Sequence, residues 1–434
     1  MKNITIYLLL ALACLGLQSC LFQEENYFDD SSANRATADV NRCGELLKTA
    51  PNGWVMEYYV GKDYSLGGIT LLCKFDGQRV TMASQIAGAD ETVSSLYSVK
   101  SEQATMLSFD TYNYLVHYFG QPQGSMADDP NGTLGGDYEF VISDATADRI
   151  ELKGKKYGNR IVMKAFSADQ TWKQYLTRIK KVEDDAFFYE YDLRMDGLYT
   201  GQMLRSNYTF IVTYYDEVGK VYQKTVPFMF TTDGMRFHEP VTIDGQTMQN
   251  FVWKNEEISF VCTDEGATGV KMKGIYIDGY QSYDYYPGTY LMDFYRLNGA
   301  TNQLEVASQE IQLVKNEDGK SYWLKGLEYD ILVTYDKPRG GLSILPQFLK
   351  KVQGGYVYLA MWDLMNDYVL RSSAIGLISY PTTDGIYLVD NGVWMGEISG
   401  FIFGVYDSQD EEASFMGYTD AVAAIRLIKK TIEE

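Results

Sequence analysis

Two histidines are the side chains whose pKa best suits general acid–base chemistry near neutral pH. His117 follows Asp110 and Asn113, and a histidine oriented by a carboxylate serves as the base in many hydrolases. The sequence contains neither a Gly-x-Ser-x-Gly elbow nor a His-Glu-x-x-His pair. It therefore favours a packed His117 that is hydrogen-bonded to the backbone or to Asp110, with a functional polar cluster of Asp110, Asn113 and His117 as the alternative. His238, beside Glu239, is predicted to lie in a solvated turn.

Carboxylates are the other groups that could do chemistry, because two of them about 5 Å or about 6.5–9.5 Å apart can hydrolyse a glycosidic bond. The chain has 58 acidic residues, so some pair always qualifies and the sequence cannot select one. Asp128–Gly132 lacks the spacing and the terminal glutamate of an EF-hand loop, which favours an exposed turn over a calcium site. The sequence also lacks a phosphate-binding glycine loop. It predicts no catalytic residue, no metal and no cofactor.

Aromatic side chains could bind a ligand without catalysis, because ring faces suit the apolar C–H faces of hexoses. The chain has 36 Tyr, 20 Phe and 6 Trp. The predicted platform combines a tyrosine cluster with three tryptophans: Tyr280, Tyr283, Tyr285, Tyr286 and Tyr290, with Trp323, Trp362 and Trp394. The alternative is burial, because aromatic residues are also good strand and core residues. Carbohydrate binding at this platform is therefore a hypothesis.

Cys20 is predicted to be lipidated. Lys2 gives a positive start, Ile6–Leu17 is a short apolar run, and Leu17–Cys20 has the order apolar, any, small, cysteine. Cleavage before such a cysteine leaves its thiol to carry diacylglycerol and acyl chains such as palmitate. The apolar run is too short to span a bilayer, which takes about 20 residues. Residues 1–19 are thus a predicted lipoprotein signal peptide, and an ordinary secretory signal with a chance cysteine is the alternative.

Residues 20–30 form a predicted acidic tether, with Glu24, Glu25, Asp29 and Asp30 close behind the cysteine. An acidic patch at this place resembles the export tag of Bacteroidetes-type surface lipoproteins. The resemblance implies a lipid anchor in the outer membrane that faces the exterior, and the periplasmic face is the alternative.

Charge and cysteine content limit the class of partner. The formal net charge is −20. Lys2 is the only charged residue in the segment 1–19, so removal of this segment brings the net charge to near −21. Such a chain repels nucleic acid. Cys43, Cys73 and Cys262 then remain besides Cys20, an odd number that predicts buried thiols with at most one pair rather than a disulfide framework.

Two helices are predicted among many strands. Ser31 and Ser32 can cap a helix that runs to Thr49, with apolar residues at helical spacing. Ser167 and Gln170 have the spacing of a capping box, which predicts a helix from there to about Val182. Its apolar stripe is predicted to be buried, and comprises Trp172, Tyr175, Leu176 and Ile179.

The remaining pattern predicts a mainly β fold of antiparallel meanders, in barrels or sandwiches. Apolar and polar residues alternate in short runs, with hairpin turns at Asp76-Gly77 and Asp244-Gly245. Pro227 predicts an edge strand or a bulge in its run. We divide the chain into a β-rich domain over 31–270, with sub-units 31–182 and 183–270, and a C-terminal β-rich domain over 271–434.

Several stretches together resemble a family of Bacteroidetes surface lipoproteins, domain of unknown function 4302, over roughly residues 22–265. The matching stretches are Ala50–Tyr58, Leu107–Asn113 leading to His117–Phe119, Gly135–Phe140, Leu152–Lys156, Asp233–Phe237 and Pro240–Ile243. The resemblance implies a lipid-anchored, β-rich envelope protein. It also implies partners in nutrient uptake, such as a TonB-dependent transporter or a glycan-binding lipoprotein, and it implies no catalytic residue.

The sequence thus favours a non-enzymatic binding or accessory protein of a nutrient uptake system, for a glycan or a peptide. The first alternative is an envelope assembly protein that binds other proteins through exposed strand edges. The second is a glycoside hydrolase that uses two carboxylates. A concave aromatic groove would favour the binding protein, and a long unpaired strand edge would favour the assembly protein. Two convergent carboxylates in a cleft would favour the hydrolase.

Overall fold

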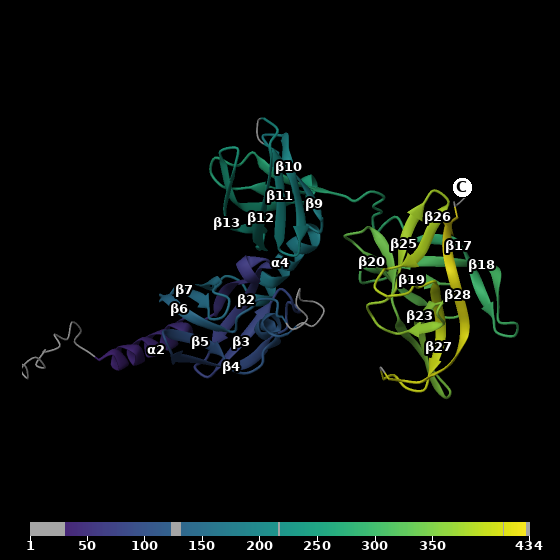
Figure 1. Cartoon of the computed structure of the whole chain (residues 1–434), viewed down its shortest axis with the longest axis horizontal. Helices are drawn as coiled ribbons and strands as arrows, with labels where there is room; N and C mark the ends of the chain where they lie inside the picture. Colours follow the sequence, from purple (N-terminus) through teal and green to yellow (C-terminus); the bar gives the residue numbers. More distant parts are fainter. Residues whose placement is uncertain (1–30, 123–131, 216–217, 411, 431–434) are drawn as a thin grey trace, which may run out of the picture. The chain divides into compact units, whose positions relative to one another are not determined.

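The computed structural model describes residues 31–122, 132–215, 218–410 and 412–430 (Figure 1). The predictions for Cys20, for the acidic tether and for most of Asp128–Gly132 lie outside the described residues. The described chain divides into two compact units. Unit 1 comprises the described residues up to Ala186 and Leu193–Lys273, and unit 2 comprises Phe187–Asp192 and the described residues from Gly274 onward.

The first part of unit 1 is a closed barrel of antiparallel strands that follow one another in chain order. The strands are β1 (Trp54–Val60), β2 (Gly67–Phe75), β3 (Arg79–Ser84), β4 (Val93–Ser101), β5 (Thr105–Phe109), β6 (Glu139–Ala145), β7 (Arg149–Gly154) and β8 (Arg160–Ala165). Side chains alternate between the two faces of each strand. In β1, Trp54, Met56 and Tyr58 are fully buried in the barrel core, so Val55, Glu57 and Tyr59 lie on its outer face.

Helix α2 (Ser32–Thr49) packs into the core of the first barrel, and its prediction is confirmed. Ser31 is the N-cap, and its hydroxyl accepts a hydrogen bond of 3.1 Å from the Asn34 amide. Cys43 and Leu47, one turn apart, are 1% exposed. The Trp54 indole then donates to the Leu47 carbonyl at 2.8 Å, which fixes the helix against β1. Short helical turns occur at α3 (Tyr114–His117), η1 (Lys62–Tyr64), η2 (Tyr118–Gly120) and η4 (Asn255–Glu257).

Helix α4 (Trp172–Asp185) joins the two barrels of unit 1 and begins later than predicted. The capping box is formed by Thr171 and Gln174, so the box predicted at Ser167 and Gln170 is wrong. The reason lies in the preceding residue, because Phe166 donates its amide to the Gly53 carbonyl at 2.8 Å and is buried against the outer face of the barrel. The predicted stripe does face the protein, since Leu176 and Ile179 are fully buried.

Another closed antiparallel barrel makes up the second part of unit 1, except that the first residues of β9 and the last of β16 are assigned to unit 2. Its strands are β9 (Glu190–Met195), β10 (Leu198–Ser206), β11 (Thr209–Tyr215), β12 (Val221–Phe230), β13 (Gly234–Ile243), β14 (Gln246–Lys254), β15 (Ser259–Cys262) and β16 (Val270–Ile275). β12 lies between β11 and β13, yet Pro227 occupies an edge-like position in it, because Pro227 pairs with Thr209 of β11 alone. The ladder between β12 and β13 begins only at Phe228, so Pro227, which has no N–H, precedes it.

The two barrels of unit 1 are in direct backbone contact. A Cβ atom added to Gly67 of β2 would lie 2.0 Å from the Tyr208 carbonyl oxygen of the second barrel. The φ angle of Gly67 is +72°, which L residues rarely adopt. The Tyr208 side chain packs against the core of the first barrel. This contact therefore depends on a residue without a side chain.

Unit 2 is built on a single antiparallel sheet of twelve strands within the described residues. The strands are β17 (Gly288–Asn298), β18 (Gln303–Lys315), β19 (Ser321–Lys325), β20 (Ile331–Asp336), β21 (Gly341–Ile344), β22 (Gln347–Val352), β23 (Gly355–Asp363), β24 (Tyr368–Leu370), β25 (Leu377–Thr382), β26 (Gly385–Asp390), β27 (Gly400–Tyr406) and β28 (Phe415–Lys429). A pairing of β17 with β28 closes eight of them into a barrel. The sheet continues from β28 through β27 and β23 to β22, and we call these three strands, with β24 beside β23, the side branch.

The prediction of a mainly β, antiparallel fold with an N-terminal helix and one helix between β units is confirmed. The strands β9, β10, β16, β22 and β24 were not predicted. Cys43, Cys73 and Cys262 are all buried and free, in agreement with the predicted thiols. In the part of the chain that the structure describes, no helix is long and apolar enough to cross a membrane.

Candidate functional site

The predicted polar cluster at His117 forms a helix cap. Asn113 is fully buried and is the N-cap of α3, where its side-chain oxygen accepts from the Leu115 amide at 3.2 Å. The Nδ1 atom of His117 lies 3.1 Å from the Asn113 carbonyl oxygen, and its ring stacks on Tyr138 at 4.7 Å. Asp110 is exposed, and its amide donates to the Leu96 carbonyl at 2.9 Å. The structure thus brings Asn113 and His117 together through the backbone and gives them a structural role.

His238 does not lie in a solvated turn, and that prediction is wrong. It lies in β13, with its side chain 14% exposed. Its ring centre is 4.2 Å from that of Tyr59 and 4.1 Å from that of Tyr64, both in the first barrel. Burial lowers the pKa of His238, so the ring is neutral at neutral pH.

Most of the predicted tyrosine platform is part of the core of unit 2. Tyr286, Tyr290 and the neighbouring Tyr322 are fully buried. Their hydroxyls donate to backbone carbonyls, as in the 2.8 Å bond from Tyr286 to Gly340 and the 2.7 Å bond from Tyr322 to Tyr283. Burial raises the pKa of these phenols. Neutral phenols that are bonded to the backbone fix the loop before β17 and leave no ring face for a ligand.

The other members of the predicted platform are scattered. Tyr283 is half-buried and stacks on Tyr322 at 4.7 Å, and Tyr280 stacks on Phe187 at 6.0 Å. Trp362 is 4% exposed in a small cluster with Ala360 and Ile402. Tyr285 and Trp323 are 39% and 36% exposed, and Trp394 donates to the Asp363 carboxylate at 3.0 Å. These residues do not line a common cavity in the part of unit 2 that is described.

A different set of aromatic residues does line a cavity, which lies on the side branch of unit 2. Its volume is about 650 Å³. We call it the aromatic groove, and its lining consists of Pro346, Gln347, Phe348, Tyr358, Val369, Leu370, Arg371, Ser372, Ser373, Tyr406, Gln409, Asp410, Ala413 and Phe415. Its rings come from β22, β23, β27 and β28. The groove is therefore held by paired strands and not by a loop alone.

Strand alternation explains why these rings gather on one face. In β23, Val357 and Leu359 are fully buried in the core of unit 2, so Tyr358 between them points to the opposite face. Phe348 of β22 is paired directly with Tyr358, and their ring centres are 5.4 Å apart. On the other side, Tyr358 lies 5.7 Å from Tyr406. Phe348 is 45% exposed and Tyr358 is half-buried, whereas Tyr406 is only 4% exposed. Phe348 and Tyr358 therefore form the open part of the aromatic surface, and Tyr406 supports Tyr358 from the side.

Arg371 and Gly404 complete this surface. The Arg371 guanidinium lies 4.8 Å from the ring centre of Tyr358 and 4.2 Å from that of Tyr406. A Cβ atom on Gly404, which is paired with Tyr358, would lie 2.9 Å from the Tyr406 ring and 3.2 Å from the Phe415 ring. The absence of a side chain at Gly404 therefore lets the two rings lie over β27.

Polar groups of the groove have distinct roles. Gln347 is already engaged, because its amide accepts from the Leu332 amide at 2.8 Å and donates to the Leu332 carbonyl at 2.9 Å. Ser372 and Ser373 are exposed, and Arg371 donates to the Asp410 carbonyl at 2.6 Å. Burial raises the pKa of Tyr406 against the opposing effect of Arg371, which keeps the phenol neutral. The groove thus combines neutral rings, hydroxyls and one cation.

Sequence reasoning missed this groove because it did not predict β22. The signal was present, since Gln353-Gly354-Gly355 separates the run Phe348–Val352 from the alternating run Tyr356–Leu359. Two short runs joined by glycines form a hairpin. Pairing them would have placed Phe348 beside Tyr358. The contribution of Tyr406 and Phe415 could not be read in this way, because it depends on pairings with distant strands.

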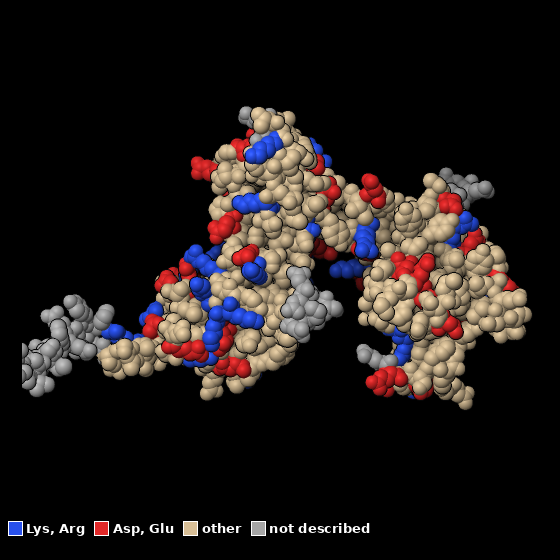
Figure 2. Space-filling view, in the orientation of Figure 1, with Lys and Arg blue, Asp and Glu red and all other residues tan. Residues whose placement is uncertain are grey.

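Unit 1 contains a polar cavity of about 200 Å³ between its two barrels. Its lining is mostly charged or polar and consists of Glu57, Tyr59, Arg149, Arg160, Val162, Lys164, Arg236, His238, Glu239 and Gln249. Figure 2 shows a group of Lys and Arg side chains over the first barrel, beside acidic ones. We call this the inter-barrel cavity. Among the described residues, no group of three or more His, Cys, Asp or Glu side chains could hold a metal ion.

Comparison with known proteins gives a family but no activity. Residues 263–402 match the model of DUF4987, a domain of unknown function. A crystal structure of a protein of unknown function from the DUF3598 family of Nostoc punctiforme is similar at 7% identity, covering 57% of this chain and 98% of that chain, with a TM-score of 0.15. No curated protein matches. Residues 24–255, more than half of the chain, match the model of DUF4302, a domain of unknown function, and the chain therefore belongs to the DUF4302 family.

Proposed function

We propose that the protein is a non-enzymatic, lipid-anchored envelope protein that binds a glycan in the aromatic groove of unit 2. The anchor is supported by the signal pattern that ends at Cys20. The glycan is supported by the groove itself, in which Phe348 and Tyr358 present ring faces away from the core and the buried Tyr406 packs beside Tyr358. The groove is the single observation that carries the proposal.

The chemistry of the groove suits a sugar ring. The C–H faces of a hexose pack on aromatic faces, and its hydroxyls need hydrogen-bond donors and acceptors beside those faces. Ser372, Ser373 and Arg371 provide such groups at the rim. The volume of about 650 Å³ lies within the roughly 300–1,000 Å³ of small-molecule sites. The groove therefore has room for a short oligosaccharide.

Assembly through a strand edge is less well supported. The end of the sheet at β22 is six residues long and carries Lys350 and Lys351. Short edges with lysines discourage the addition of a further strand. Both hydrogen bonds of the Gln347 side chain to Leu332 also occupy this end.

A glycoside hydrolase is also less well supported, because the described lining of the groove lacks a pair of carboxylates. Hydrolysis needs two carboxylates on opposite sides of the scissile bond. Among the described residues that line the groove, Asp410 is the one carboxylate. A binding role needs no second acid.

The test is titration calorimetry of the chain from residue 21 against a panel of neutral oligosaccharides. Loss of the Tyr358 ring is expected to weaken binding by about fivefold, since stacking on one ring contributes on the order of 1 kcal/mol. Trp323→Ala is the matched control, because Trp323 is an exposed aromatic residue of unit 2 outside the groove. Failure of every saccharide to bind, or equal losses in Tyr358→Ala and Trp323→Ala, would contradict the proposal.

A further inference from the structure

The inter-barrel cavity of unit 1 is a second built site, and strand geometry explains its charge. Arg149 of β7 is paired with Lys164 of β8, and Glu57 of β1 is paired with Val162 of β8. Arg160 lies two residues before Val162, so it shares the outer face of the barrel with Lys164. Three cations of the first barrel therefore face the second barrel from adjacent strands.

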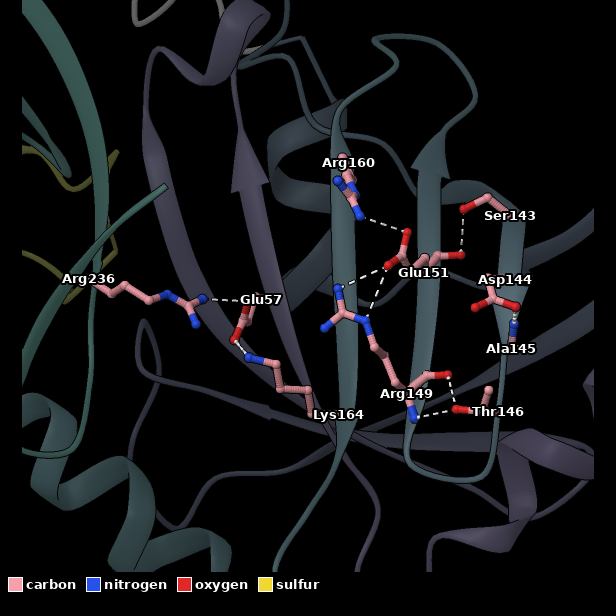
Figure 3. Close-up of polar contacts among 10 residues, drawn as sticks. All are labelled: Glu57, Ser143, Asp144, Ala145, Thr146, Arg149, Glu151, Arg160, Lys164 and Arg236. Carbon is pink, nitrogen blue, oxygen red and sulfur yellow. Dashed lines mark hydrogen bonds and ion pairs between the residues drawn. The ribbon is translucent and has the colours of Figure 1, made fainter. Parts of the chain in front are cut away.

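Each of two carboxylates at this face is shared by two cations (Figure 3). Glu57 forms ion pairs with Arg236 of the second barrel at 2.5 Å and with Lys164 at 2.7 Å. Glu151 forms ion pairs with Arg149 at 3.0 Å and with Arg160 at 2.9 Å. Four positive charges thus lie beside two negative ones.

The carboxylates are ionised. Burial acts to raise the pKa of Glu57, but Arg236 and Lys164 outweigh it and hold the pKa below its ordinary value. Hydrogen bonds from Arg149 and Arg160 lower the pKa of Glu151. Glu239 adds a third carboxylate at the rim, where it is 76% exposed and 3.8 Å from His238. The four cations still outnumber the three carboxylates by one, in a chain whose net charge is −20.

Tyr59 provides an independent observation. Its side chain is among those that line the cavity, and the residue is 3% exposed. Its hydroxyl makes no hydrogen bond of good geometry in the described part of the chain, although the Arg236 guanidinium lies beside it. A buried polar group without a partner costs free energy unless a ligand or water satisfies it. The Arg236 guanidinium lies close enough to lower the pKa of this phenol, against the larger effect of burial.

The far wall of the cavity is held by an irregularity of β13. The register between β13 and β14 shifts between Arg236 and Val241, and such bulges often re-aim side chains at functional sites. Gln249 of β14 donates to the carbonyls of Phe237 and His238 at 3.2 and 3.3 Å. The bulge is therefore fixed by side-chain hydrogen bonds, and it holds Arg236 and His238 toward the first barrel.

We propose that the inter-barrel cavity binds the acidic group of a small anionic ligand, a carboxylate, sulfate or phosphate. Arginine side chains recognise these oxygens with paired hydrogen bonds, and the Tyr59 hydroxyl supplies a further donor. The volume of about 200 Å³ is below that of most drug-sized sites and admits one small acid or one acidic sugar ring. The site is separate from the aromatic groove and does not depend on the glycan proposal.

Calorimetry of the chain from residue 21 with glucuronate, inorganic sulfate, inorganic phosphate and glucose tests this inference. At least one of the three anions is expected to bind saturably and to weaken with added salt, whereas any binding of glucose in the aromatic groove is expected to be independent of salt. The anion that binds identifies the acidic group. Absence of binding by all three anions, or anion binding that added salt does not weaken, would overturn the inference.

Three variants locate the binding. Arg160→Gln, at a side chain that is 60% exposed, is expected to weaken the anion about tenfold, the loss of one charge-assisted hydrogen bond. Tyr59→Phe removes only the hydroxyl and is expected to weaken binding by a smaller factor. Lys173→Ala is the control, because Lys173 is an exposed cation on α4 that does not line the cavity. Equal affinities in Arg160→Gln, Lys173→Ala and the parent chain would overturn the site, while binding in the aromatic groove is untouched by these changes.

Discussion

The Arg236 guanidinium of the second barrel lies 2.5 Å from the Glu57 carboxylate of the first. The side chains of Glu57 and Arg236 are 13% and 24% exposed, so the pair is largely removed from water. Their ion pair stands between the inter-barrel cavity and a neighbouring, more apolar cavity of about 310 Å³, because both residues line both. The pair therefore separates the two cavities and also links the two barrels.

Removal of Arg236 is expected to destabilise unit 1. Arg236→Met leaves the Glu57 carboxylate buried beside Lys164 alone, and breaking such a pair costs about 3–5 kcal/mol. Urea unfolding followed by circular dichroism, with hydrogen exchange of β1 and β13, measures the change. In the double variant Glu57→Gln/Arg236→Met the loss is expected to be smaller than the sum of the single losses. Additive losses would show that the two side chains do not interact.

The stability of unit 1 is expected to depend on the ionisation of Glu57. Its pKa is lower in the folded chain than its ordinary value of 4.5, so its contribution is present above that value. The contribution is lost as the pH falls through the folded pKa. The free energy of unfolding of the parent chain should therefore decline more steeply below about pH 4.5 than that of Glu57→Gln. Parallel pH profiles for the two chains would contradict this assignment.

The close approach of Gly67 and Tyr208 predicts a strong effect of one methyl group. Gly67→Ala places a Cβ 2.0 Å from the Tyr208 carbonyl oxygen, so the barrels must separate. Gly245→Ala is the matched control, because Gly245 has a φ of +75° and no heavy atom within 4 Å of an added Cβ. The control should cost only the left-handed strain, about 1–2 kcal/mol, and Gly67→Ala should cost clearly more in the same urea titration. Equal costs would mean that the backbone contact is not tight.

Gly404 offers a second way to test the aromatic groove. Gly404→Ala forces the Tyr406 and Phe415 rings to shift, and it removes no ring. Glycan affinity is therefore expected to fall by several-fold, at a stability cost of roughly 1–3 kcal/mol for the added volume. Calorimetry and thermal unfolding measure the two effects. Unchanged affinity in a destabilised variant would show that these two rings do not contact the ligand.

The three buried thiols are expected to be unreactive in the native chain. Cys43, Cys73 and Cys262 are free, and burial raises the pKa of each, to about 11 for Cys262. Since the thiolate is the reactive form, Ellman's reagent should titrate none of them before denaturation and all three in guanidinium. A thiol that reacts at once in the chain from residue 21 would identify a region that opens easily.

Local patterns predicted the elements that local patterns control. Ser31 before a helix with Cys43 and Leu47 on one face, and Asp76-Gly77 between two alternating runs, were correctly interpreted. The start of α4 was placed too early because the sequence offers two capping boxes, and burial of Phe166 against the barrel selects the later one. Propensity could not decide between them.

The candidate sites could not be predicted in the same way. Tyr286 and Tyr358 lie in equally aromatic stretches, yet one is fully buried and the other faces the groove. Tyr286 lies in the loop before β17, where its hydroxyl bonds to the Gly340 carbonyl. Tyr358 faces away from the core because β23 is fixed by its pairings with β27 and β22. The inter-barrel cavity joins Glu57, Arg160 and Arg236, which are far apart in the chain and carry no common motif.

The long strand β28 has a consequence for the order in which the chain folds. The first barrel closes when β8 pairs with β1, and all of its strands are made before α4. Unit 2 closes only when Leu427 and its neighbours in β28 pair with β17, and ten strands of the described sheet lie between these two in the chain. Because such distant pairings form slowly, unit 1 can fold while the chain is still emerging, and unit 2 must wait for β28. Until then the apolar faces of β17 and β27 stay open, so unit 2 exposes aggregation-prone surface for longer than the first barrel does.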